Sequence, residues 1–152
     1  MPARDIRKII KKLIQKAGTN NPYKICKELG ILVEFKDLGK VLGFFKCHRR
    51  QKIICLNETL CPIRAKQVCA HELGHVVLHP CVNTVYLDLC TYAVTEKFEN
   101  EANRFAAELL ITDADASEHK EQSIEAIAST LGVSKNLVEY KLKGLNEAIL
   151  LE

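Results

Sequence analysis

Two histidines and a glutamate in one short segment have the types and spacing of a metal-dependent hydrolytic site. The segment reads His-Glu-Leu-Gly-His, with the histidines at His71 and His75 and the glutamate at Glu72. Residues four apart on a helix lie one turn apart on the same face, so the two imidazoles could bind one metal ion. Glu72 would lie beside them, where a carboxylate can take a proton from an attacking water molecule.

The residues around this motif indicate that its helix is buried. The flanking positions are almost all apolar: Val68, Cys69, Ala70, Leu73, Val76, Val77 and Leu78. Burying two imidazoles and a carboxylate costs free energy unless they have partners, and a bound cation would be such a partner. The same spacing also occurs on ordinary helices, so the motif alone leaves a purely structural interpretation open.

A second helical segment, residues 98–110, offers a third ligand. It carries an apolar stripe at helical spacing: Phe98, Ala102, Phe105, Ala106 and Leu109. Glu99 falls at the edge of this stripe, whereas Glu101 falls with Glu108 on the face that we predict to be exposed. Glu99 is therefore the preferred third ligand and Glu101 the alternative, although either could be an ordinary solvated carboxylate. Asn103, one turn after Glu99, could hydrogen-bond a ligating imidazole.

Taken together, the two segments resemble the ImmA/IrrE family of metallo-endopeptidases. The first contributes His-Glu-Leu-Gly-His, and the second contributes Glu-x-x-Ala-Asn-x-Phe-Ala-Ala-Glu-Leu-Leu from Glu99 onward. The resemblance extends from about Tyr23 to about Leu145. One departure lies past the ligands, because many relatives continue Leu-Leu-Met-Pro whereas this chain continues Leu-Leu-Ile-Thr, ending at Thr112.

The resemblance implies a zincin-like fold and a zinc-dependent endopeptidase, with Mn²⁺ as the alternative to Zn²⁺. The ion would be bound by His71, His75 and Glu99, and Glu72 would be the base. Members of the family typically cleave a helix-turn-helix repressor and thereby switch on genes of a phage or mobile element. The implied partner is therefore a protein substrate of that kind. The rival hypothesis is a non-catalytic regulatory protein that binds DNA or a partner, but such a protein would not need Glu72.

The composition fits one soluble domain and argues against a nucleic-acid-binding or membrane-spanning protein. The chain has 152 residues, of which 47% are hydrophobic and 27% charged, enough for a buried core. A net charge of +3 is too small to predict nucleic-acid binding. Seven cysteines without a CxxC pair or a signal peptide predict reduced thiols in a cytoplasmic protein. No apolar run reaches the roughly 20 residues of a membrane span.

The elements that must position the motif follow in chain order. A helix from Ile6 to Ala17 has a basic outer face, which we interpret as solvated rather than as a nucleic-acid surface. A second helix begins at Asn21-Pro22. Strands at 31–35, 41–47 and 52–57 predict a small antiparallel meander. The motif helix would begin near Pro62 and end at His79.

Three further residues near the motif are weaker candidates for a role in the site. His79 would lie about 12 Å from His71 along the helix, too far to share an ion with it, so we expect a packing or helix-end role. Residues 80–97 predict a loop at the mouth of the site, a lid or substrate wall. Tyr86 or Tyr92 in this stretch could donate a hydrogen bond to an oxyanion, although core packing is the simpler interpretation.

The last forty residues predict a helical pair. Residues 112–122 indicate a polar linker, and residues 124–142 have the pattern of a helix-turn-helix, with Gly132 at the turn and Ser134 as a cap. Basic residues on the second helix would suit a DNA groove: Lys135, Lys141 and Lys143. Only Asn136 is suited to reading bases, so a structural or partner-binding pair is favoured. We predict an α+β fold, with a zincin-like domain at 1–112 and this helical segment at 113–152.

Overall fold

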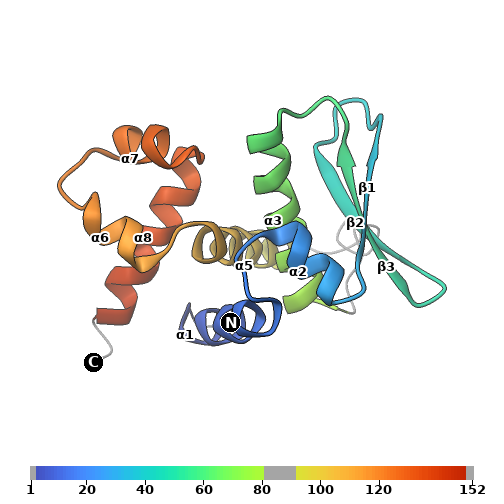
Figure 1. The fold of residues 1–152 in the computed structure, drawn as a ribbon, viewed down its shortest axis with the longest axis horizontal. Helices are drawn as coiled ribbons and strands as arrows, with labels where there is room; N and C mark the ends of the chain where they lie inside the picture. The colour runs from blue at the N-terminus through green and yellow to red at the C-terminus, as the bar shows by residue number, and fades with distance from the viewer. Residues whose placement is uncertain (1–2, 81–91, 150–152) are drawn as a thin grey trace.

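A small β-sheet lies at one end of a set of helices that carries most of the chain (Figure 1). The computed structural model describes residues 3–80 and 92–149. In chain order the elements are α1 (Ala3–Ala17), α2 (Pro22–Glu28), β1 (Leu32–Lys36), β2 (Gly43–His48), β3 (Gln51–Asn57), α3 (Pro62–Leu78), α5 (Tyr92–Leu110), α6 (Asp113–Glu118), α7 (Ile124–Leu131) and α8 (Lys135–Ile149). This confirms the predicted α+β fold with three strands, a helix for the His-Glu-Leu-Gly-His motif and a C-terminal helical pair.

The sheet is mixed, so the prediction of an antiparallel meander is wrong in one pairing. The strand order is β1-β3-β2, with β3 antiparallel to β2 but parallel to β1. β3 carries the continuous apolar run Ile53–Leu56, all of it buried, whereas β1 exposes Leu32 and Phe35. A strand that is apolar on both faces gains most from the central position, which places the two more polar strands on either side of it.

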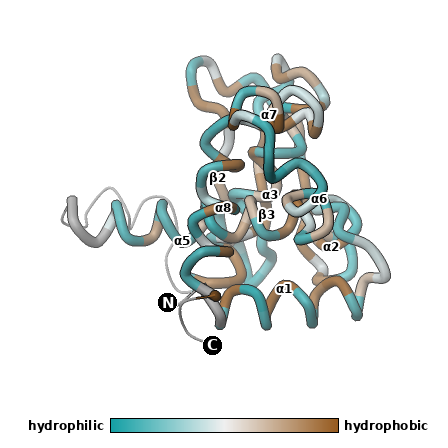
Figure 2. Tube along the Cα trace, turned by 90° about the vertical axis from the view of Figure 1, so that its left-hand side faces the viewer, coloured by the Kyte–Doolittle hydropathy of each residue, from teal (hydrophilic) through white to brown (hydrophobic). Residues whose placement is uncertain are grey.

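α1 ends and α2 begins where the sequence predicts, whereas α1 begins at Ala3, three residues before the predicted start. Gly18 follows α1 with φ 67°, a left-handed conformation that glycine adopts readily. Asn21 caps α2 by accepting a hydrogen bond from the N–H of Tyr23 at 3.0 Å, and Pro22 takes the first helical position. Hydrophilic and hydrophobic residues alternate along α1 (Figure 2), which buries Ile6 and Ile10 and exposes its lysines.

The core is centred on α3 and α5, which cross at close range. Leu73, Phe105 and Ala106 are fully buried between them, and one continuous apolar cluster extends from there to α1, the sheet and α8. Buried residues of both predicted parts, 1–112 and 113–152, belong to this cluster; the division itself stays a prediction. None of the described helices is long and apolar enough to cross a membrane.

Five described cysteines are free thiols. Cys26, Cys55 and Cys69 are buried, whereas Cys47 and Cys61 are exposed. Burial raises the pKa of the Cys55 thiol, and the hydrogen bond with Cys26, followed by burial, raises that of Cys69. Cys55 and Cys69 are therefore held protonated and unreactive in the core.

The C-terminal part has the predicted helix-turn-helix pattern, but the segment before it differs from the prediction. Gly132 ends α7 in the left-handed conformation, and Ser134 caps α8 by accepting from the N–H of Leu137 at 3.4 Å. The stretch predicted to be a linker instead contains α6. Thr112 and Asp115 form a reciprocal capping box there, and Ala116 is buried. The sequence signal for this helix was the cap itself, since six residues are too few for an apolar stripe.

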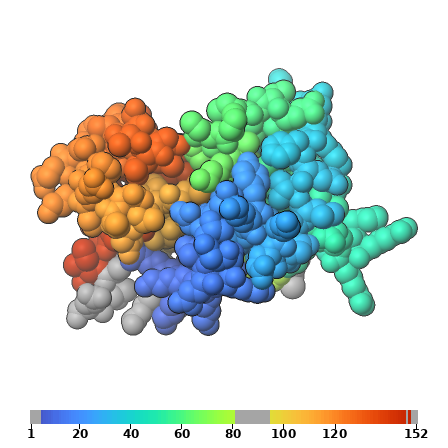
Figure 3. Space-filling view, in the orientation of Figure 1, coloured from blue at the N-terminus to red at the C-terminus, as the bar shows by residue number. Residues whose placement is uncertain are grey.

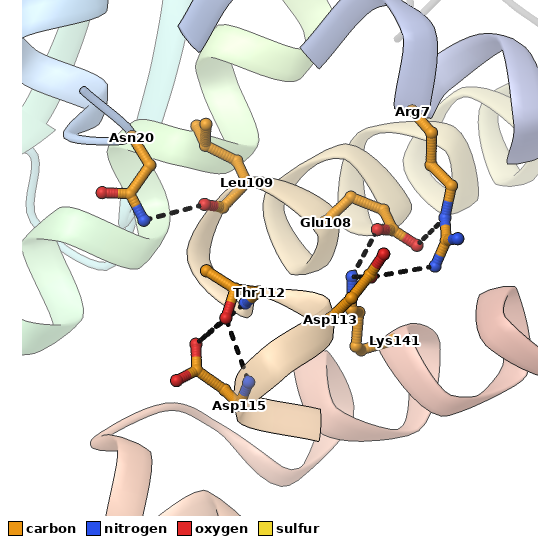
Figure 4. A network of polar contacts seen from close by, with 8 residues as sticks. All are labelled: Arg7, Asn20, Glu108, Leu109, Thr112, Asp113, Asp115 and Lys141. Carbon is orange, nitrogen blue, oxygen red and sulfur yellow. Dashed lines mark hydrogen bonds and ion pairs between the residues drawn. The ribbon is translucent and has the colours of Figure 1, made fainter. Parts of the chain in front are cut away.

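A buried ionic cluster joins α8 to α1, α5 and α6 (Figure 4). Nζ of Lys141 lies 2.6 Å from both Glu108 and Asp113, and Nε of Arg7 lies 3.0 Å from Glu108. Lys141 is only 2% exposed. Lys141 therefore does not contribute to the DNA-facing surface that was the less favoured interpretation of this helix, and the prediction that Glu108 is solvated is wrong. Both side chains are internal because each provides the charge that the other needs in order to be buried.

Replacing Lys141 with methionine is expected to lower the free energy of unfolding by about 2–4 kcal/mol. The change leaves the buried Glu108 carboxylate with Arg7 as its remaining cation, and breaking a buried pair costs more than the pair contributed. Urea unfolding followed by circular dichroism measures the loss. The exposed Lys143, on the same helix, is the matched control, and Lys143→Met should change stability by less than about 0.5 kcal/mol. Equal effects of the two substitutions would contradict the role given to Lys141.

Candidate metal centre

Three side chains from two helices converge at the point where α3 and α5 cross. Nε2 of His71 lies 3.1 Å from Nε2 of His75, and both face the carboxylate of Glu99. The Glu99 oxygens lie 3.2 Å from Nε2 of His71 and 3.1 Å from Nε2 of His75. The structure thus brings together the three residues that the sequence singled out as ligands. Of the two glutamates considered, Glu99 is the one whose carboxylate reaches both imidazoles.

This spacing fits one tetrahedral cation. Donor atoms bound at about 2.0–2.2 Å to a tetrahedral ion lie roughly 3.3–3.6 Å from one another, within a few tenths of an ångström of the distances seen here. Two nitrogens and one carboxylate are also a donor set that suits zinc. His75 is 4% exposed, His71 21% and Glu99 43%, so the cluster is buried at His75 and accessible at Glu99.

Asn103 orients one of the imidazoles. Its Oδ1 lies 3.0 Å from Nδ1 of His71. Because a carbonyl oxygen only accepts, Nδ1 carries the hydrogen, which leaves the lone pair of neutral His71 on Nε2, facing Glu99. Phe45 of β2 stacks on His75, with ring centroids 6.1 Å apart, and restrains the second imidazole from the sheet side.

Charges within the cluster are strongly coupled. When the imidazoles are protonated, hydrogen bonds from His71 and His75 lower the pKa of the Glu99 carboxyl. Burial on its own would lower the pKa of His71, but the hydrogen bond to Glu99 and the charges of Glu72 and Glu99 outweigh it and raise this pKa. Three electron-rich atoms this close together are unfavourable unless protons or a cation lie between them, which is what a metal site requires.

Glu72 lies in a cavity of about 610 Å³ that also reaches His71 and Asn103. Its side chain is 8% exposed and has no hydrogen bond or ion pair among the residues the structure describes. Burial raises the pKa of this carboxyl, while His71 and His75 oppose the rise. A buried carboxylate without partners, beside three converging donors, is placed to accept a proton from a molecule in the cavity.

Glu101 lies elsewhere, and the prediction that it is solvated is wrong. It is 8% exposed, and its Oε2 lies 3.3 Å from Nε2 of His79. His79, the residue that follows α3, packs on Phe98 with ring centroids 4.2 Å apart, in agreement with the predicted packing role. Sequence periodicity could not show this, because His79 covers the face of α5 that would otherwise be exposed.

The comparisons with known proteins agree with this geometry. Residues 26–143 match the model of the peptidase M78 family, described as the IrrE N-terminal-like domain. The chain belongs to this family. It is 37% identical over 139 residues to a phage phi105 protein called uncharacterized immunity region protein 2, covering 90% of this chain and 88% of that protein. It is 34% identical over 146 residues to metallopeptidase ImmA of Bacillus subtilis strain 168, covering 92% and 85% respectively.

Gly74 is a residue of this M78 family chain whose role the sequence reasoning missed. A Cβ at this position would lie 3.1 Å from Cβ of Phe105 and 3.2 Å from the backbone of Ala102. The absent side chain lets α3 and α5 approach closely enough for the histidines of one helix to meet Glu99 of the other. The signal was present in the sequence, since a glycine inside a buried helix indicates a close backbone approach.

Gln67 is a second such residue. It is buried, one turn before His71 on α3, and its side-chain amide bridges the turn between α7 and α8. Nε2 of Gln67 donates to the carbonyl of Gly132 at 3.3 Å, and Oε1 accepts from the N–H of Ser134 at 3.1 Å. The C-terminal helical pair is therefore attached directly to the motif helix. The bonded residues are separated by 65 and 67 positions in the sequence, so helical periodicity does not reveal this contact.

Tyr86, one of the two predicted oxyanion donors, lies outside the described residues. Tyr92 is the first residue of α5. The loop predicted at 80–97 is wrong for residues 92–97, which belong to α5; residues 81–91 lie outside the described part of the chain, where the lid stays a prediction.

Replacing Asn103 with alanine is expected to weaken zinc binding about 10- to 100-fold. The substitution removes the acceptor that fixes the His71 ring and its tautomer, and such partners of metal ligands typically contribute this much. Titration with zinc in competition with a chromogenic chelator measures the change. Asn100→Ala, on the exposed face of the same helix, is the control and should leave zinc affinity unchanged. Loss of fold rather than of affinity, seen by circular dichroism, would contradict a positioning role.

Proposed function

We propose that this chain is a zinc-dependent endopeptidase that cleaves a helix-turn-helix repressor and thereby derepresses genes of a phage or mobile element. One observation carries the proposal: His71, His75 and Glu99 converge within 3.1–3.2 Å of one another beside Glu72, which has no hydrogen bond or ion pair with the described residues. In this proposal the first three residues hold the metal, with Zn²⁺ preferred to Mn²⁺ for two nitrogens and one carboxylate. Membership of a metallopeptidase family supports both roles.

The chain's own residues account for binding and proton transfer. When bound, zinc supplies a Lewis acid that polarises the peptide carbonyl and makes water more acidic. Glu72 takes a proton from the attacking water and later delivers it to the leaving amide nitrogen. The cavity that contains Glu72 is also lined by Leu42 and by Gly43, the first residue of β2. Among the described strands β2 pairs only with β3, so its outer edge can add an extended peptide as a further strand.

The substrate proposal draws on the relatives' names. One is an immunity region protein of a phage and another is a metallopeptidase, which together support a protein substrate in phage immunity. A helix-turn-helix repressor is the kind of protein that the family resemblance implies. The free thiols fit a reducing compartment, and we place the activity in the cytoplasm.

The rival function, a non-catalytic DNA-binding regulator, has less support. Lys141 is buried, and Lys135 and Asn136 line the same cavity as Glu72. The residues that would read a DNA groove therefore face the proposed active site. We accordingly propose that the C-terminal pair binds protein rather than nucleic acid.

Incubating the zinc-loaded chain with the repressor encoded beside it tests the proposal. Mass spectrometry should show two fragments that add up to the intact repressor, and a sample stripped of metal should leave the repressor whole. Metal analysis of the purified chain should find about one zinc per molecule. A repressor that stays intact with the zinc-loaded chain would overturn the proposed substrate, and retained cleavage without metal would overturn the mechanism.

A further inference from the structure

The cavity beside the motif has two chemically different ends. At one end lie His71, Glu72 and Asn103, and at the other lie Arg64 of α3 and the first turn of α8. The apolar floor between them is formed by Val68, Ala106 and Leu137, one from each of three helices. Figure 3 shows the orange C-terminal segment lying against the green start of α3, which is where this second end is built.

The second end is cationic. The charged side chains that line it are Arg64 and Lys135, and both are exposed. Arg64 forms no hydrogen bond or ion pair with any residue that the structure describes. Lys135 lies 3.1 Å from Glu125, but the two side chains are 61% and 62% exposed, and a surface pair of this kind is weak enough to exchange for another carboxylate.

The backbone adds partial positive charge at the same place. Ser134 caps the N–H of Leu137, whereas the N–H groups of Lys135 and Asn136 have no acceptor within the described part of the chain. They are the first two residues of α8, where the helix dipole also favours an anion. Gln67 holds this turn against α3, so the donors are fixed relative to the site.

The buried carboxylate of Glu72 indicates that the cavity receives a ligand. It is 8% exposed, lines the same cavity and has no partner among the described residues. A substrate bound at Glu72 therefore has the cationic end of the same cavity within reach. Arg64 precedes His71 by seven residues, about 10 Å along the helix axis. An extended peptide covers that distance in about three residues.

We propose that Arg64, Lys135 and the first turn of α8 form a subsite for an acidic side chain of the substrate, about three residues from the bond that is cut. This inference rests on the proposed endopeptidase function and adds a substrate preference to it. The helix-turn-helix element then contributes to specificity in peptide recognition. Lys135 and the first turn of α8, together with Arg64 of α3, select an Asp or Glu of the protein substrate rather than a DNA phosphate.

Peptide capture tests the subsite without requiring cleavage. The bait is the zinc-loaded Glu72→Gln protein, immobilised on a support. It is exposed at low salt to a chymotryptic digest of bacterial proteins. The peptides that stay bound are then sequenced by mass spectrometry. We expect peptides with Asp or Glu to be enriched about three- to tenfold over matched peptides with Lys or Arg. In the same background, Arg64→Glu/Lys135→Glu should abolish or reverse this preference.

The control has the same change of charge on another helix. Lys8→Glu/Lys12→Glu alters two exposed residues of α1, which does not line the cavity, and should leave the preference intact. Equal unfolding midpoints for all variants establish that the fold is retained. Captured peptides without acidic enrichment, or enrichment that survives the Arg64→Glu/Lys135→Glu exchange, would overturn the subsite.

Cleavage of the same digest by the unmodified chain separates this inference from the proposed function. New termini should have Asp or Glu enriched about three residues from the cut, and the enrichment should disappear with Arg64→Glu/Lys135→Glu. If no new termini form while capture keeps its acidic preference, the peptidase proposal fails and the subsite stands as a peptide-binding site. If new termini form with no acidic preference, the peptidase stands and the subsite fails.

Discussion

Glu72→Gln is expected to lower the rate of peptide hydrolysis by about 10²- to 10⁴-fold while zinc stays bound. Glutamine has nearly the shape of glutamate but accepts no proton at neutral pH, so the variant loses the general base alone. The three proposed ligands do not include Glu72, and its side chain has no hydrogen bond or ion pair among the described residues that the change would break. Initial rates of repressor cleavage, together with zinc content, measure both effects.

Glu101→Gln is the matched control for this substitution. It makes the same chemical change at a residue that is also 8% exposed, but one that contacts His79 and lies outside the three-residue cluster. Cleavage should therefore stay within a few-fold of the parent rate. A Glu72→Gln variant that cuts as fast as the parent would show that another group accepts the proton. A variant without zinc would show that Glu72 acts as a ligand.

The site was predictable because its chemistry is local. His71, Glu72 and His75 lie within five residues on one helix, and helical spacing alone places the imidazoles together. Predicting Glu99 as the third ligand required one further step. The apolar stripe of a second helix had to show which side of that helix faces the core. The same periodicity failed at Glu101 and Glu108, because it assumes that charged residues opposite an apolar stripe are solvated. Both carboxylates are instead covered by side chains from outside α5, Glu101 by the imidazole of His79 and Glu108 by the ammonium group of Lys141.

Long-range contacts account for the other differences. The parallel pairing of β1 with β3 depends on which strand takes the centre, and short spacing between strands carries no information on that order. Residues 113–118 form a helix because Thr112 caps it and the core accepts Ala116, although too few apolar residues are present to predict it. The cavity between α3 and α8 depends on Gln67, which bonds a turn 65 and 67 residues away. Such contacts are properties of the folded chain rather than of any segment.

Glu99→Gln is expected to reduce zinc affinity by more than about 100-fold and to abolish cleavage at low zinc. A neutral amide is a far weaker ligand for a divalent cation than a carboxylate, and partners of ligands alone already contribute 10- to 100-fold. Glu99 is 43% exposed and lies on the outer side of the cluster, so its loss should leave the core intact.

Glu101→Gln again provides the comparison, two residues away on α5. It should bind zinc as tightly as the parent, because its carboxylate faces His79 rather than His71 and His75. Competition with a chromogenic chelator gives both affinities, and added zinc should restore part of the lost cleavage only in Glu99→Gln, since mass action refills a weakened site. Equal zinc affinity in the two variants would exclude Glu99 as the third ligand, and a loss confined to Glu101→Gln would transfer that role to Glu101.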